Sequence, residues 1–204
     1  MSDRPAAASY RPISDARTLR AFAHPVRSRI LDELNARGPQ RSADLAEVLG
    51  LPANQVSFHV RNLATYGLVV EAPEHARDRR DRVWKLADDG HGFTLELARI
   101  EDEPGGASIA SAWRGLAVGR AHREVEAAYS AERDPATVRN IMQATFLLTK
   151  EEAEELAADL NEVMGRWTGR SRESGGEGRQ VYALLQLLQP RPDDLAPGSE
   201  GEDA

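Results

Sequence analysis

The chain has 204 residues, of which 41% are hydrophobic, and this is enough for the buried core of one large domain or two small ones. It contains no cysteine, which excludes disulfides, thiolate metal sites and a cysteine nucleophile. The formal net charge is -7, but residues 11–88 hold 13 Lys and Arg against 10 Asp and Glu, whereas residues 89–204 hold 12 against 22. A polyanion would therefore bind the first part of the chain and be repelled by the second.

Residues 1–14 are rich in Pro, Ala and Ser, and we expect them to be disordered. They carry no apolar run of the kind that a secretory signal needs, and no later stretch approaches the length of a membrane span. The sequence therefore predicts a cytoplasmic protein without membrane contact.

Two helices are expected next. The stretch SDARTLRAFA offers Ser14 or Asp15 as the N-cap of a short amphipathic helix. The stretch HPVRSRILDELNARG predicts a second helix with Pro25 in its first turn and a stop at Gly38. Its expected buried stripe consists of Val26, Ile30, Leu31 and Leu34.

A closely spaced pair of helices follows. RSADLAEVLGL predicts a short helix that Ser42 caps and Gly50 ends, and LPANQVSFHVRNLATYG predicts a helix that begins at Pro52 and ends at Gly67. A connection of only a few residues favours a steep crossing, which is the helix-turn-helix arrangement. The inward side chains of the second helix are expected to be Val56, Val60 and Leu63.

After Gly67, LVVEA and DRVWKLA read as two strands, and the charged loop PEHARDRRD between them makes a β-hairpin. We interpret this hairpin as the basic wing of a winged helix. Because Asp78 and Asp81 accompany the arginines, a solvated hairpin tip whose charges pair with one another is the alternative.

Residues 89–190 are expected to be mainly helical. TLELARI suits a short helix, and the stretch from Ala107 to Arg133 a long one, which needs an apolar partner for its stripe. NIMQATFLL, TKEEAEELAADLNEVMGRW and RQVYALLQLLQP then predict a strand-helix-strand unit, and residues 191–204 a disordered tail. The stripe of the long helix is Ile109, Trp113, Leu116, Ala117, Ala121, Val125 and Tyr129.

The expected fold class is therefore α+β, mainly α with small β elements. A winged helix-turn-helix over 15–88 is followed by a dimerisation or effector region over 89–190. Aromatic and methionine side chains of the second region line either an ordinary core or a small-molecule cavity: Trp113, Tyr129, Met142, Phe146, Met164, Trp167 and Tyr182.

The second helix of the pair has outward side chains suited to DNA. Amides can bond adenine in two places, arginine can bond guanine or a phosphate, and an exposed Phe can contact a thymine methyl. Ser42, in front of the preceding helix, can hold a phosphate, and His59 is either structural or a phosphate contact. The expected outward residues are Asn54, Gln55, Ser57, Phe58, Arg61 and Asn62, and the expected wing cations are Arg77, Arg79, Arg80 and Arg82.

LRAFAHPVRSRILDEL, SADLAEVLGLPANQVSFHVRNLATYGLV and the hairpin resemble the ArsR-type winged-helix transcriptional regulators over about residues 13–88. The resemblance implies a symmetric dimer that occupies an operator in double-stranded DNA, usually represses, and is released by a ligand or signal. Metal-sensing members use cysteine or His/Asp/Glu clusters, and the five histidines here have no ligand-like spacing. We therefore expect neither a metal site nor another cofactor.

The sequence leaves two main readings open. The first is a dimeric DNA-binding regulator, in which the long helix pairs with its copy. The second is a winged-helix module that binds a protein partner without reading DNA sequence. An enzyme is not expected, because there is no serine elbow, phosphate-binding glycine loop or set of paired metal ligands.

Overall fold

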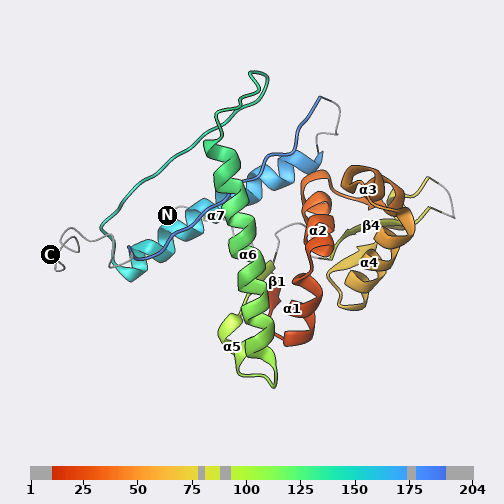
Figure 1. Cartoon of the computed structure of the whole chain (residues 1–204), viewed down its shortest axis with the longest axis horizontal. Helices are drawn as coiled ribbons and strands as arrows, with labels where there is room; N and C mark the ends of the chain where they lie inside the picture. The colour runs from red at the N-terminus through yellow and green to blue at the C-terminus, as the bar shows by residue number, and fades with distance from the viewer. Residues whose placement is uncertain (1–10, 78–80, 88–92, 174–177, 192–204) are drawn as a thin grey trace, which may run out of the picture.

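The computed structural model describes residues 11–77, 81–87, 93–173 and 178–191 (Figure 1). The expected fold class is confirmed, because most of the elements are helices and the sheets are small. The helices are α1 (Ala16–Phe22), α2 (Pro25–Arg37), α3 (Ser42–Leu49), α4 (Ala53–Thr65), the 3-10 turn η1 (Pro73–His75), α5 (Leu97–Glu101), α6 (Gly106–Tyr129) and α7 (Lys150–Glu173). The strands are β1 (Arg11–Ile13), β2 (Gln40–Arg41), β3 (Val69–Glu71), β4 (Val83–Leu86) and β5 (Phe93–Leu95).

Helices α2, α3 and α4 pack with an antiparallel sheet of order β2-β4-β3, and we call this unit, residues 25–86, the head. The predicted hairpin is confirmed: Val69 lies opposite Leu86, and Glu71 opposite Trp84. Strand β2 was not predicted. Its two residues link α2 to α3, and Arg41 lies opposite Val83, so the hairpin is attached to the start of α3.

A side chain caps the start of α1 as predicted, but the cap predicted for α3 is wrong. Asp15 caps α1, because its Oδ1 accepts a hydrogen bond of 2.8 Å from the backbone N–H of Thr18. Ser42, predicted as the cap of α3, is instead its first helical residue. The cap is Arg41, whose backbone N–H donates to Asp44 Oδ2 at 3.2 Å, so that a carboxylate satisfies this end of the helix.

The residues next to Ile13 differ from the prediction. Residues 11–13, expected to be disordered, form β1, which pairs in parallel with β5 so that Ile13 lies opposite Leu95. The first part of TLELARI is therefore strand, and only its end is helix α5. The physical reason is burial, since Ile13 is 2% exposed and completes the core.

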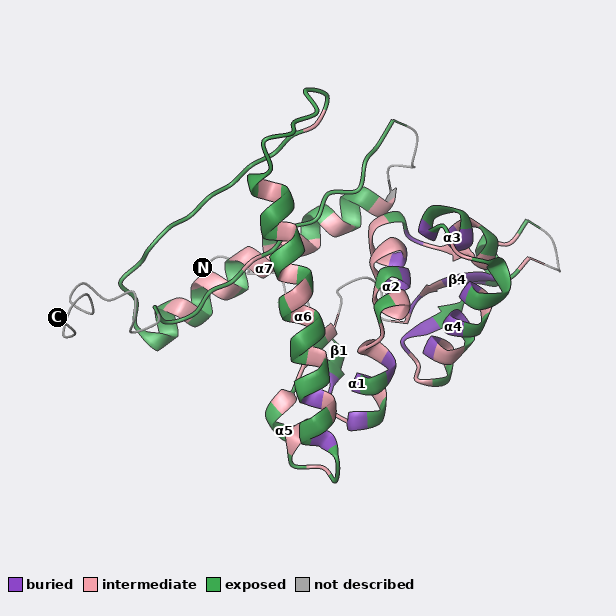
Figure 2. Cartoon of the chain, viewed as in Figure 1, coloured by how far each residue is buried: buried purple, intermediate pink, exposed green. Residues whose placement is uncertain are grey.

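A single buried core runs across residue 88, where we expected a domain boundary. Ile100 and Ala110, which follow the expected boundary, belong to the same cluster as Leu19, Ile30 and Val60. The beginning of α6 packs on α1 and α5, and Figure 2 shows that its later turns are largely exposed. Head and C-terminal helices are thus joined through apolar contacts at α1, α5 and the start of α6.

Polar contacts attach the two long helices to α2. Arg120, which interrupts the apolar stripe of α6, donates from Nη1 to Asp32 Oδ2 at 2.7 Å. On α7, Arg172 donates to the backbone oxygen and the side-chain oxygen of Asn35, at 3.0 and 2.7 Å. Neither of these helices, nor any other in the described part of the chain, is long and apolar enough to cross a membrane.

The predicted strand-helix-strand unit is wrong in its strands. Helix α7 is present, but residues 140–148 and 179–190 contain no strand, and both run as extended chain (Figure 1). A strand is stable only when its apolar face is covered, and here Met142, Phe146 and Tyr182 are exposed. Tyr129 and Trp167, expected in a core or cavity, are exposed as well.

Candidate nucleic-acid interface

Helices α3 and α4 form the predicted helix-turn-helix pair. Helix α3 ends at Gly50, whose backbone is left-handed (φ 64°), and whose N–H donates to the carbonyls of Ala46 and Glu47. Leu51 and Pro52 complete the connection, and α4 begins at the following residue. The turn is short, and it places α4 on the surface of the head with one side available to a partner.

The inward side of α4 is as predicted. Val56, Val60 and Leu63 are completely buried and pack into the core of the head. Their spacing of four and three residues puts them in one row, which fixes the rotation of the helix about its axis. The opposite row must therefore face solvent.

That opposite row carries Asn54, Gln55, Phe58 and Arg61, all exposed, with the Phe58 ring 62% exposed. Arg61 donates from Nε to the carbonyl of Ser57 at 3.0 Å, which holds the guanidinium along the helix. Ser57 itself is half-buried at the edge of the row. Arg61 is the one charged residue of α4, so the row presents amides, an aromatic ring and a single cation.

Asn62, which was predicted on this row, and His59, expected to be either structural or a phosphate contact, both lie off the row. Asn62 is half-buried, and its Oδ1 accepts a hydrogen bond of 2.7 Å from Arg27 Nη1, so it joins α4 to α2. His59 is 7% exposed and lies on the buried side, with its ring centroid 4.7 Å from that of His24. A contact of His59 with DNA does not fit this position, because the ring would have to leave the core.

His24, Arg27 and His59 form a partly buried basic cluster between α2 and α4. His24 caps α2, since its Nδ1 accepts from the backbone N–H of Val26. His59 Nδ1 and Arg27 Nε are buried and make no hydrogen bond to the described residues. Burial lowers the pKa of both histidines, and the positive charge of Arg27 lowers each pKa further. The cluster is thus stable with neutral rings.

The cluster predicts that acid destabilises the fold. Because the pKa of each ring is lower when folded than its ordinary value of 6.5, the unfolded chain binds more protons below that pH. The stabilisation is complete above the ordinary pKa of about 6.5 and is lost progressively as the pH falls below it, through the lowered pKa values of the folded rings. Urea unfolding at several pH values tests this, and His59→Phe should flatten the dependence; an unchanged slope in that variant would rule out His59 as a source.

Two cations of the hairpin form ion pairs with acidic side chains of the hairpin itself. Arg82 lies 3.6 Å from Glu71, and Lys85 is 3.0 Å from Glu74. Arg77 is exposed, whereas Arg79 and Arg80 lie outside the described residues. The predicted alternative, in which hairpin charges pair with one another, therefore describes Arg82 at least in part.

Arg41 connects the hairpin to α3 next to Ser42, which is half-buried. The guanidinium of Arg41 binds the carboxylate of Asp44, and its Nη1 lies 3.7 Å from the carboxylate of Asp81, just before β4. The hydrogen bond from Arg41 lowers the pKa of Asp44. Sequence reasoning missed the contact between Arg41 and Asp81, because the pairing of β2 with β4 is what brings these two residues together.

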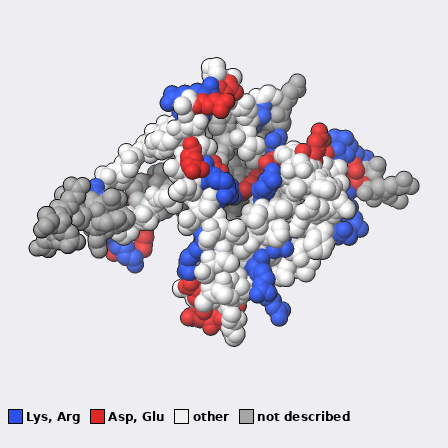
Figure 3. Space-filling view, in the orientation of Figure 1, with Lys and Arg blue, Asp and Glu red and all other residues white. Residues whose placement is uncertain are grey.

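Most of the charge lies around the row of α4, which itself carries Arg61. Figure 3 shows Lys and Arg side chains at the edge of the head and near α1, with acidic side chains beside several of them, and a mostly uncharged surface between. Arg29, exposed on α2, donates to the carbonyl of Leu49 at 3.3 Å and so places a cation next to the turn between α3 and α4. This arrangement can contact bases at the centre and phosphates around it.

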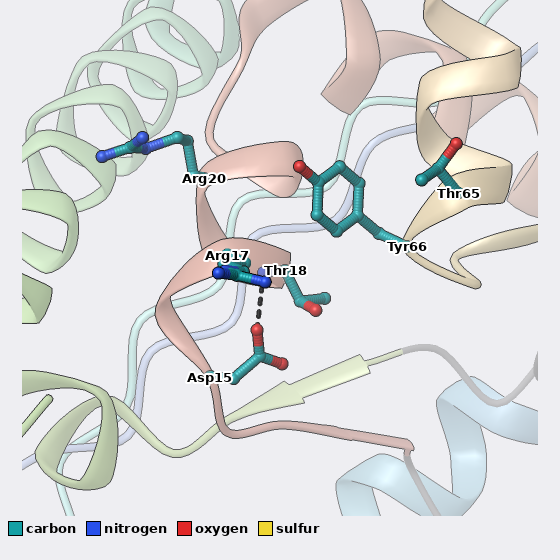
Figure 4. A pocket seen from close by; sticks show the side chains of 6 residues that line it. All are labelled: Asp15, Arg17, Thr18, Arg20, Thr65 and Tyr66. Carbon is teal, nitrogen blue, oxygen red and sulfur yellow. Dashed lines mark hydrogen bonds between the residues drawn. The ribbon is translucent and has the colours of Figure 1, made fainter.

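A shallow, open pocket lies where α1 meets the end of α4 (Figure 4). Asp15 is engaged in capping α1, and none of the aromatic side chains expected to line a cavity takes part. The described residues also contain no group of three or more acidic or histidine side chains that could hold a metal ion. The pocket is lined by Asp15, Arg17, Thr18, Arg20, Thr65 and Tyr66.

A sequence match to a known family agrees with the geometry of the head, and the chain also has distant similarity to solved structures. Among solved structures, the chain is similar to wild-type MarR from E. coli in its apo form, with 17% identity, 74% of this chain and 88% of that chain covered, and a TM-score of 0.33. It is also similar to the transcriptional regulator Tm0710 from Thermotoga maritima, with 18% identity, coverage of 76% and 85%, and a TM-score of 0.31. No curated protein matches the sequence. Residues 22–72, a quarter of the chain, match the family described as a helix-turn-helix domain, so this segment is a helix-turn-helix domain by sequence as well as by structure.

Proposed function

We propose that this protein is a DNA-binding transcriptional regulator that inserts α4 into the major groove of double-stranded DNA. The observation that carries the proposal is the row of Asn54, Gln55, Phe58 and Arg61, exposed on a helix whose opposite side is completely buried. A helix fixed in this way presents the same side chains to every partner. Its position after α3 and before the hairpin is that of a recognition helix.

Each side chain of the row has a role in this proposal. Asn54 and Gln55, in the first turn, read base edges, because an amide can donate to and accept from adenine at once. Phe58 contacts a thymine methyl, and Arg61 binds a guanine or a phosphate. Ser57 and Ser42 donate to phosphates at the edge of the groove. Asn62 and His59 are positioning residues, since both connect α4 to α2.

The hairpin is proposed to hold the backbone beside the groove. Arg77, Arg79, Arg80 and Arg82 would bind phosphates or enter the minor groove, and for Arg82 this requires exchange of its partner Glu71. Such an exchange costs little, because the pair is exposed and surface ion pairs contribute weakly.

The remaining parts of the proposal follow the resemblance to ArsR-type regulators. The protein would act in the cytoplasm as a homodimer, without catalytic activity, and would repress transcription until a small-molecule ligand or other signal releases it. The apolar side chains exposed on the later turns of α6, among them Val118 and Val125, support pairing with a second copy. Two copies would place their α4 helices about one DNA turn (~34 Å) apart.

The other candidate is a winged-helix module that binds a protein, which the exposed Phe58 ring favours, because aromatic side chains are enriched at protein interfaces. In such a module the hairpin and α4 would form the docking surface, and binding would not depend on the sequence of any nucleic acid.

Two variants separate the roles of α4 and the hairpin. We expect Gln55→Ala to change the preference for one base pair by about 1–3 kcal/mol, because a bidentate base contact is lost. We expect Arg80→Ala to weaken binding to all sequences equally, because phosphates carry no sequence information. Titration of each variant against a panel of duplexes measures both effects. If both variants lose affinity uniformly, the assignment of base reading to Gln55 is wrong.

A further inference from the structure

Two segments on either side of α7, residues 138–148 and 180–190, carry more than half of the large apolar side chains exposed on the described part of the chain. Leu147 is fully exposed, Met142 is 82% exposed and Leu184 75%. Monomeric proteins rarely expose apolar patches beyond about 300–600 Å². These segments are therefore expected to be covered in the functional protein.

Their composition is that of buried strands. Residues 140–149 and 180–190 contain no Asp, Glu, Lys or Arg, in a chain of which 29% is charged. The backbone is extended, but it forms no strand pairing, and the two segments are joined where the backbone N–H of Val138 donates to Tyr182 Oη at 3.3 Å. Uncharged extended chain with free backbone donors and acceptors is a template for pairing with another strand.

We infer that a second copy of this chain covers these segments, and that residues 138–148 and 180–190 of both copies join in one β-sheet. In a two-fold arrangement the same surface meets itself, and Arg139, whose guanidinium donates to the carbonyls of Ser130 and Glu132, is the one charged residue of the two segments, so like-charge repulsion is small. The two segments supply 22 residues from each copy, within the roughly 20–30 per side of a stable interface.

The position of the segments favours the same partner. The first segment follows α6 by only a short connection, and Val125 and Tyr129 at the end of α6 are exposed. The apolar surface is therefore continuous in sequence with the part of α6 proposed to pair in the homodimer. This inference depends on the proposed homodimer, but not on DNA binding, so it is tested in the absence of DNA.

Hydrogen exchange measured by mass spectrometry on the full chain, with light scattering on the same samples, tests the sheet. We expect a dimer in which the backbone amides of both segments are protected, and in which dilution to monomer removes that protection. The exposed loop at residues 130–137 serves as the unprotected internal control. A dimer whose two segments exchange freely would overturn the sheet and leave the homodimer standing.

Two further outcomes would also overturn the inference. Protection that persists in the monomer would mean that the sheet forms within one chain. If the protein is a monomer at every concentration, the proposed homodimer is wrong as well. If that monomer still binds DNA, the proposed role of α4 is unaffected.

Charge variants supply an independent measurement. Leu147→Asp and Leu184→Asp should each shift the protein to monomer by light scattering, with the helical circular dichroism retained, because a carboxylate would be buried in the sheet. Ala131→Asp adds the same charge at an exposed position outside both segments and should remain dimeric. Dimers of unchanged stability in both leucine variants would contradict the inference.

Discussion

Gly106→Ala is expected to lower the free energy of unfolding by about 3 kcal/mol, because the added methyl group would overlap the backbone. A Cβ at Gly106 would lie 1.7 Å from the carbonyl oxygen of Ile100 and 2.8 Å from its carbonyl carbon. Both atoms belong to the backbone of α5, so no side-chain rotation relieves the overlap. The corner between α5 and α6 must open, and Ile100 and Ala110 leave the core together.

Gly115→Ala in the same helix is the matched control. No heavy atom lies within 4 Å of a Cβ at Gly115, so this substitution should stabilise α6 by about 0.5–1 kcal/mol through its helix propensity. Thermal unfolding measures both, and for a chain of this size about 3 kcal/mol corresponds to roughly 6–12 °C. Equal melting temperatures for the two variants would show that α5 and α6 do not meet as described.

Leu63→Ala is expected to cost about 2–5 kcal/mol, because Leu63 is completely buried beneath α4 and truncation leaves a cavity. Since this side chain packs α4 against the rest of the head, both the free energy of unfolding and the affinity for DNA should fall. Chemical denaturation gives the free energy of unfolding, and a fluorescence titration with duplex DNA gives the affinity.

Phe58→Ala on the outer side of the same helix should behave in the opposite way. Its ring is exposed, so stability should change by less than about 0.5 kcal/mol. DNA affinity should still fall, by about as much as one mismatched base pair costs, roughly 1–3 kcal/mol. A loss of stability in Phe58→Ala with unchanged DNA affinity would contradict the assignment of Phe58 to the outer face of α4.

Local sequence signals predicted the head well. The stops at Gly38 and Gly50 and the row of Val56, Val60 and Leu63 are short-range features of the sequence, whereas the cap predicted for α3 was wrong. The hairpin followed from two short apolar runs on either side of a charged loop. The predictions hold because the tertiary contacts of the head stabilise the same helices and strands that the local sequence favours.

Contacts between distant residues were the part that the sequence could not provide. Strand β1 exists because Phe93–Leu95 pairs with it, although each paired residue lies 82 positions further along the chain. The packing of Arg27 against Asn62 and of His24 against His59 was not predicted, because spacing within α4 cannot show what packs on its edge. Arg120 interrupts the apolar stripe of α6, and the sequence does not show that its partner is Asp32 on α2.

The predicted strands near α7 illustrate a different limit. Their apolar composition predicts that these residues are buried, but it does not show whether the same chain or a second chain covers them. In the single chain they remain extended and exposed, and the same pattern is consistent with a sheet completed by a second copy.

The central claim is that the outer side chains of α4, with the neighbouring hairpin, hold a DNA duplex. Titration of the full chain against labelled duplex DNA at about 50 to 200 mM salt tests it most directly. We predict that affinity falls steeply as salt rises, and that Arg80→Ala makes the dependence on log salt shallower by about one unit. If the full chain binds no duplex at the lowest salt more tightly than an unrelated acidic protein does, the claim is wrong.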